Sequence, residues 1–127
     1  MESNNDVITI TETKKVISVK RAMIDHSYFE DVSAKNVKIT DANLSDLEIE
    51  GAQLGGAYIH NIGMPPKGHP FYDPDAKQRS LRFEDCDLNG STITNCNLGN
   101  VIIVDCNLKG MTINGILVED LLKGLEK

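Results

Sequence analysis

Three cysteines recur at a spacing of ten residues, at Cys86, Cys96 and Cys106. Thiols that bind a metal or carry redox chemistry must lie close together and reach the thiolate form. An odd number of cysteines also does not form a disulfide framework. Each of the three occupies a position that is small or apolar in the neighbouring stretches of the chain. We therefore interpret them as small buried apolar side chains.

The other side chains that could take part in catalysis or metal binding are scattered along the sequence. The three histidines, His26, His60 and His69, have no metal-ligand spacing with one another or with a cysteine or aspartate pair. Ser91 falls at a position predicted to be buried, so no serine or cysteine nucleophile pairs with a histidine base. No glycine-rich loop of the phosphate-binding kind is present. We expect no catalytic residue, no metal and no cofactor, and predict that the chain is not an enzyme.

The overall charge of the chain limits the classes of partner that it can bind. The net charge is −6 and the pI is near 4.9, which argues against direct binding of nucleic acid, since that needs a basic surface. The sequence has no apolar run of about 18 residues and no charged-then-apolar start. We therefore expect no membrane association and a cytoplasmic location.

A five-residue repeat must position all of these side chains. From Leu81 to Val118 an apolar residue lies at the centre of every five, and a small or apolar residue lies two positions earlier. The fifth position is Asp, Asn or Gly from Asp31 to Asn61 and from Asp85 to Gly115. These residues tolerate tight turns, so each five is predicted to be a short extended side followed by a corner. The centres are Phe83, Leu88, Ile93, Leu98, Ile103, Leu108 and Ile113.

The repeat has the motif Ala-Asp/Asn-Leu-X-X, which 42–44 matches as Ala-Asn-Leu and which the copies starting at Cys86, Cys96 and Cys106 match with Cys in place of Ala. Over about residues 22–118 the chain resembles the pentapeptide-repeat proteins. The resemblance implies an all-β fold, a right-handed quadrilateral parallel β-helix with four fives in each coil and both apolar positions pointing inward. Stacked coils would bury these side chains and pair their backbones about 4.8 Å apart.

The segments outside the repeat complete the expected single domain, 1–127. Residues 1–16 form an N-terminal cap, in which the alternating segment 7–11 is predicted to be a strand. The repeats occupy 17–118, and an insertion at 65–80 contains all four prolines, so it is predicted to loop out from one corner. In 117–127 apolar residues recur three and four apart, which predicts a short C-terminal α-helix that covers the open end.

We predict a soluble, protein-binding scaffold with an unknown protein partner. The insertion carries the candidate partner-binding residues His69, Phe71 and Tyr72, because loops on rigid scaffolds often carry recognition; the competing interpretation is that the two aromatic rings fold back onto the nearest wall. The helix offers a candidate homodimer contact through Leu121, Leu122 and Leu125.

The alternative function follows from the family resemblance. In its gyrase-protecting members an acidic rod resembles duplex DNA and binds topoisomerase. A chain of this length would need to dimerise to form such a rod, and several basic side chains dilute its acidic surface, namely Lys35, Lys38, Arg82 and Lys109. Fold alone does not decide between a scaffold and a DNA mimic.

Overall fold

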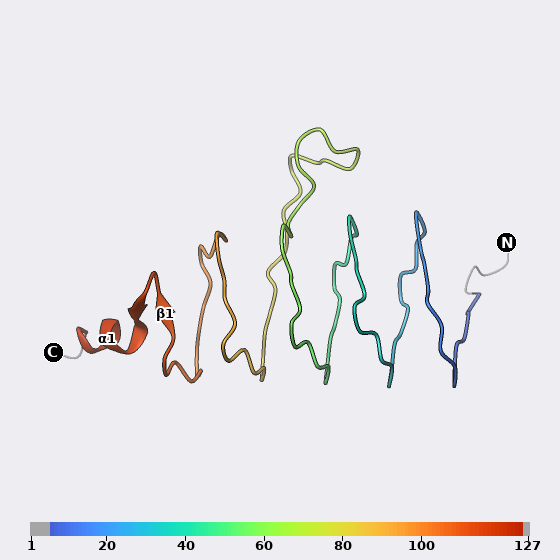
Figure 1. The fold of residues 1–127 in the computed structure, drawn as a ribbon. Coiled ribbons are helices and arrows are strands. Elements are labelled where there is room, and N and C mark those ends of the chain that lie inside the picture. Colours follow the sequence, from blue (N-terminus) through green and yellow to red (C-terminus); the bar gives the residue numbers. More distant parts are fainter. Residues whose placement is uncertain (1–5, 126–127) are drawn as a thin grey trace. The chain divides into compact units, whose positions relative to one another are not determined.

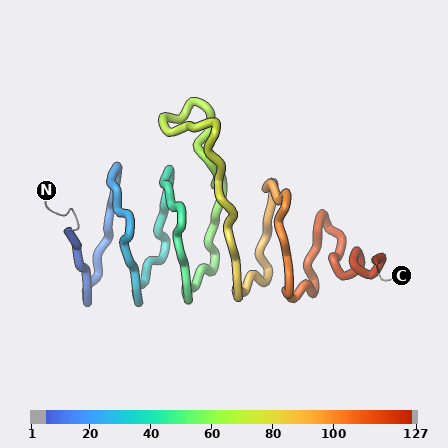
Figure 2. The backbone as a smooth tube through the Cα atoms, turned by 180° about the vertical axis from the view of Figure 1, so that it is seen from behind, coloured from blue at the N-terminus to red at the C-terminus, as the bar shows by residue number. Residues whose placement is uncertain are grey.

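The structure is a computed structural model that describes residues 6–125. The chain divides into two compact units, Met1–Ala57 and Tyr58–Lys127. Within each unit the backbone winds through successive turns, as the ribbon and the tube show (Figures 1 and 2). The turns are built from short extended sides that are separated by sharp corners.

The corners recur at every fifth residue. Positive φ angles cost little for Gly, Asn and Asp and more for other residues. They occur at all of the predicted corner positions from Asp31 to Asn61 and from Asp85 to Gly115. The same conformation extends the pattern two repeats upstream, to Arg21 with φ 50° and His26 with φ 68°. The prediction of a corner after every extended side is therefore confirmed on both sides of the insertion.

Two kinds of corner alternate along the chain. After Leu88 and Leu98 the carbonyl of the leucine accepts a hydrogen bond from the N–H three residues on, at 3.0 and 3.1 Å. Positive φ at the third residue of each turn, Gly90 and Asn100, makes these type II turns. The corner that follows Ile93 is a bend without such a bond. The alternation of leucine and isoleucine at the repeat centres thus coincides with an alternation of corner type.

The parallel ladder of a stacked β-helix is not formed within residues 6–125. The strands there are β1 (Thr112–Ile113) and β2 (Ile116–Leu117), and they pair antiparallel with Ile113 opposite Ile116. A parallel ladder needs neighbouring coils about 4.8 Å apart, but the turns here are open and Leu98 is 53% exposed. The strand predicted at 7–11 is not formed for the same reason, since no segment among the described residues pairs with it.

The hairpin of β1 and β2 is an element that the five-residue frame does not predict. Its two central residues, Asn114 and Gly115, both have positive φ, at 49° and 81°. This is the type I′ conformation, which suits the right-handed twist of a two-stranded hairpin and favours Asn-Gly. The frame marks Gly115 as one more corner, whereas the Asn-Gly pair is itself a strong hairpin signal.

The C-terminal helix is present as α1 (Val118–Lys123), shorter than the predicted 117–127, of which 126–127 lie outside the described residues. Glu119 and Asp120 lie in its first turn and Lys123 in its last, in keeping with the helix dipole. Val118, at 8% exposure, is the one buried side chain among residues 6–125. Its N–H donates to the carbonyl of Met111 at 2.9 Å, so the core of this unit lies where the helix returns to the last repeat.

The insertion 65–80 leaves the path of the repeats and protrudes as the green-to-yellow excursion of Figure 1. Three turns order it, in which N–H groups donate to carbonyls three residues earlier. The donor and acceptor residues are His69 and Pro66 at 3.0 Å, Tyr72 and His69 at 3.0 Å, and Ala76 and Asp73 at 3.2 Å. Gly68, with φ 98°, permits the first of these turns. The excursion is thus a folded loop with a defined backbone.

Candidate functional site

The loop 65–80 brings together the three residues predicted to contact a partner. Phe71 is 80% exposed and Tyr72 is 42% exposed, while His69 is half-buried. Nδ1 of His69 accepts a hydrogen bond from the N–H of Phe71 at 3.1 Å, and the two rings lie 5.8 Å apart between centroids with an interplanar angle of 43°. The Phe71 ring therefore does not fold back into a buried position, and the backbone beneath it is fixed at three consecutive turns.

A second exposed aromatic group, missed by the sequence analysis, lies at the start of the second unit. The rings of Tyr58 and His60 stack with centroids 3.9 Å apart and an interplanar angle of 10°. The side-chain amide of Asn61 lies 3.2 Å from Nδ1 of His60 and can donate to it. Residues two apart in an extended segment lie on the same face, so the spacing Tyr-Ile-His was the available signal for this stack.

The three cysteines are free and exposed in the structure, so the prediction of buried thiols is wrong for the open turns. Burial would require the next coil to cover the inward position, and the coils are unpaired. Each thiol instead donates a hydrogen bond to the carbonyl two residues earlier, across a bend corner. The acceptors are Glu84 at 3.2 Å, Thr94 at 3.4 Å and Val104 at 3.3 Å. The S–H group is a weak donor, and this hydrogen bond across the bend gives a physical reason for cysteine at the first position of the repeat.

No group of three or more His, Cys, Asp or Glu side chains within residues 6–125 could hold a metal ion. His26 forms a corner of the repeat with φ 68°, whereas His60 and His69 each engage Nδ1 in a local hydrogen bond. In the described part of the chain, the His69 ring and the three thiols therefore bond to nearby backbone groups, whereas the His60 ring lies against the side-chain amide of Asn61.

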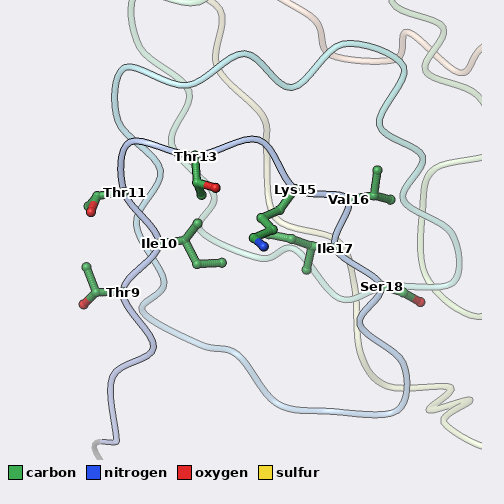
Figure 3. A pocket seen from close by; sticks show the side chains of 8 residues that line it. All are labelled: Thr9, Ile10, Thr11, Thr13, Lys15, Val16, Ile17 and Ser18. Carbon is green, nitrogen blue, oxygen red and sulfur yellow. The ribbon is translucent and has the colours of Figure 1, made fainter.

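A hollow of about 540 Å³ lies within the first turn of the chain. Figure 3 shows Ile10, Lys15 and Ile17 pointing into this turn, while Val16 and Ser18 point away from it. The side chains that line it are Thr9, Ile10, Thr11, Thr13, Lys15, Val16, Ile17 and Ser18, so Lys15 supplies its one ionisable group. A general acid–base pair is not available in such a set. Lys15 belongs to the predicted N-terminal cap, 1–16, and not to a repeat.

The candidate homodimer contact lies on and just after α1. Leu121, Leu122 and Leu125 are all exposed, and the helix that carries two of them is tied to the last repeat corner by a bond from the N–H of Gly110 to Oε1 of Glu119 at 3.1 Å. Homodimerisation through these leucines stays a prediction. None of the helices found in residues 6–125 has the length and apolar character needed to span a bilayer.

Comparison with known families agrees with this geometry. Residues 81–116 match the family model for pentapeptide repeats, in eight copies. The matched segment contains the corners from Asp85 to Gly115 and the three cysteines. Residues 81–116 are therefore pentapeptide repeats, and the family match is confined to this segment. No curated protein and no solved structure matches the chain significantly.

Proposed function

We propose that the chain is a non-enzymatic scaffold that binds a protein partner through the loop 65–80. The observation that carries the proposal is the exposure of Phe71, at 80%, on a backbone ordered by three consecutive turns. Aromatic residues dominate the energetics of protein interfaces. A loop that is already ordered before binding loses less conformational entropy when it binds.

The scaffold beneath the loop is proposed to be the right-handed quadrilateral β-helix of the family. The regular corners divide the chain into sides of similar length, and the open turns leave the inward apolar positions, such as Leu98 and Ile103, more than half exposed. Burial of apolar surface contributes about 25 cal/mol per Å². Closing the turns onto one another would bury these side chains and pair the sides as parallel strands.

The hydrogen bonds of the histidine rings and thiols support the proposal that the chain is not an enzyme. Nδ1 of His69 accepts a backbone N–H, Nδ1 of His60 lies against the amide of Asn61, and each thiol donates to a carbonyl. A nucleophile needs a neighbouring base within hydrogen-bond reach, and these partners are backbone or amide groups instead.

The test is affinity capture from the source cell with the tagged full chain and two matched variants. Phe71→Ala removes the exposed ring from the loop. Ile102→Ala removes an equally exposed apolar side chain, at 84%, from the outward face of a repeat. The proposal expects a partner that the parent and Ile102→Ala retain and that Phe71→Ala loses. A partner retained equally by all three proteins would overturn the assignment to the loop.

The same capture separates the scaffold from the topoisomerase-directed DNA mimic. A mimic would bind a topoisomerase through its acidic faces, so Glu48→Lys and Glu50→Lys would abolish binding while Phe71→Ala would leave it unchanged. The scaffold proposal expects the reverse pattern, because the two glutamates belong to a repeat and not to the loop.

A further inference from the structure

The side chain of His69 organises the tip of the loop. Its Nδ1 accepts the N–H of Phe71 at 3.1 Å, and its carbonyl accepts the N–H of Tyr72 at 3.0 Å. A ring nitrogen of histidine can accept a hydrogen bond only while it carries no proton. An imidazole that accepts this N–H through Nδ1 would be neutral and would carry its proton on Nε2.

The same kind of hydrogen bond, in which a side chain accepts from the backbone N–H two residues later, recurs in the chain with oxygen acceptors. The pairs of acceptor and donor residue are Asn43 and Ser45 at 3.0 Å, Asp73 and Asp75 at 2.9 Å, Asp87 and Asn89 at 2.9 Å, Asn97 and Gly99 at 2.9 Å, and Asn107 and Lys109 at 3.0 Å. Amide oxygens do not titrate, and carboxylates protonate only in acid. Among these bonds, the one at His69 has the acceptor type that protonates between about pH 5 and 8.

We propose that His69 is a proton switch that orders the recognition loop when the imidazole is neutral and releases Phe71 when it is protonated. The role in partner binding rests on the proposed function, whereas the effect on the loop backbone does not. The sign follows from the bond: the neutral form is the acceptor, so order at Phe71 is present at the higher pH and is lost as the pH falls.

The imidazole lies near one aromatic ring, and charged residues of both signs occur in its loop. The Phe71 ring lies 5.8 Å from it, and Asp73 uses Oδ1 to accept the N–H of Asp75 at 2.9 Å. The charged side chains of the loop are Lys67, Asp73, Asp75, Lys77 and Arg79, so basic and acidic groups are both close in sequence. The protonated ring would then turn both of its nitrogens into donors, and Nδ1 would face the N–H that it now accepts.

The chain itself supplies the matched control. Asparagine makes the same turn at Asn43, Asn97 and Asn107, so His69→Asn keeps an acceptor for the N–H of Phe71 and removes the titration. His69→Ala removes the acceptor at every pH. Because residues 66–76 lie outside the repeat frame, both variants are expected to keep the repeat fold, which far-UV circular dichroism verifies.

The experiment is a pH titration from 8 to 5 of the ¹⁵N-labelled full chain, followed by NMR. The ring nitrogens of His69 report protonation and the tautomer, the amide of Phe71 reports the bond, and the amide of Asp75 is the internal reference. In the parent we expect a neutral Nε2–H tautomer at pH 8 and a Phe71 amide shift that moves with the ring titration. In His69→Asn the Phe71 amide should be independent of pH, and in His69→Ala it should resemble the acid form throughout.

The result that would overturn the switch is a Phe71 amide that stays unchanged while the His69 ring titrates, or a parent with the proton on Nδ1 at pH 8. Capture of the partner at pH 8 and pH 5.5 then tests the coupling to binding. The amount captured at pH 5.5 relative to pH 8 should fall for the parent and stay constant for His69→Asn, whatever the affinity of that variant at pH 8. If no partner depends on Phe71 at either pH, the proposed function is wrong. The NMR titration decides separately whether His69 controls the loop backbone.

Discussion

The N–H of Gly110 donates a 3.1 Å hydrogen bond to Oε1 of Glu119. Gly110 closes the last hydrogen-bonded repeat corner, with φ 79°, and Glu119 lies in the first turn of α1. The bond joins the end of the repeats to the helix that follows, beside the buried side chain of Val118. The cap is therefore held by one side chain as well as by the hairpin that leads into it.

Glu119→Ala should weaken this cap by about 1 kcal/mol, the usual net contribution of one hydrogen bond. Glu119→Gln keeps an oxygen acceptor and should lose less. Asp120→Ala is the control, because its carboxylate makes only a 4.0 Å ion pair with Lys123 on the exposed side of the helix. Urea unfolding measures all three, and equal effects of Glu119→Ala and Asp120→Ala would contradict the role of the Gly110 bond.

The corner conformation predicts opposite results for two adjacent glycines. Gly56 has φ +81°, whereas the φ of Gly55 is not positive, and a Cβ would meet nothing within 4 Å at either residue. Gly56→Ala should therefore cost about 1 kcal/mol of backbone strain. Gly55→Ala should be neutral or stabilise by up to about 1 kcal/mol, since it restricts the unfolded chain. Equal unfolding free energies for the two variants would contradict the left-handed corner at Gly56.

The corners could be predicted from the sequence because their cause is local. A left-handed residue excludes most side chains by its own sterics, so Asp, Asn or Gly at every fifth position identifies the turns without knowledge of their neighbours. The hydrogen bond from Gly99 to the side chain of Asn97 is equally local. It gives a reason for the Asx residue before Leu98 in the family motif.

The exposure of the repeats and the site geometry could not be predicted in the same way. Burial of Cys96 or Leu98 depends on a neighbouring coil, and periodicity specifies which side chains would share a wall but not that the turns are closed. The bond between His69 and Phe71 depends on the turns at Pro66 and His69, and composition indicates only that the segment is a loop. The Asn-Gly pair at Asn114 favours a hairpin, but the five-residue repeat predicts an ordinary corner at the same place.

Stacking of the coils predicts a large difference between two neighbouring substitutions. Leu98→Asp would place a charge in an apolar wall and should cost more than about 3 kcal/mol. Asn97→Asp should be nearly neutral, because Asp87 makes the same turn with a carboxylate oxygen. Thermal unfolding followed by circular dichroism measures both. Similar stabilities would mean that Leu98 stays as exposed as in the open turns, at 53%, and would contradict the stacked β-helix.

The thiols report on the same closure without any substitution. In the open turns Cys86, Cys96 and Cys106 are accessible to solvent, whereas in stacked coils they would lie in apolar walls with little thiolate character. If the turns close onto one another as proposed, a thiol reagent in native buffer should label the chain much more slowly than in denaturant. Labelling of all three at the denatured rate would show that the coils remain open in solution.

Removal of the loop tests whether the scaffold and the recognition surface are separable. Met64 precedes the loop and Phe83 is the first repeat centre after it, and the corners resume at Asp85 with φ 54°. The backbone hydrogen bonds that order the loop join residues within 66–76, so its removal breaks none of the hydrogen bonds that close the corners after Leu54 and Leu88. Shortening a loop changes its closure entropy only slowly with length.

Replacement of 66–78 by a short Gly-Ser link should therefore leave the unfolding transition cooperative and close to that of the parent. It should abolish capture of any partner that depends on Phe71. A Gly-Ser segment of the parent length is the control, because it keeps the spacing between the flanking repeats and removes only the side chains. If both replacements unfold the chain, the loop stabilises the repeats directly. If both fold and still bind the partner, recognition lies on the repeat faces, and the outward glutamates become the residues to substitute next.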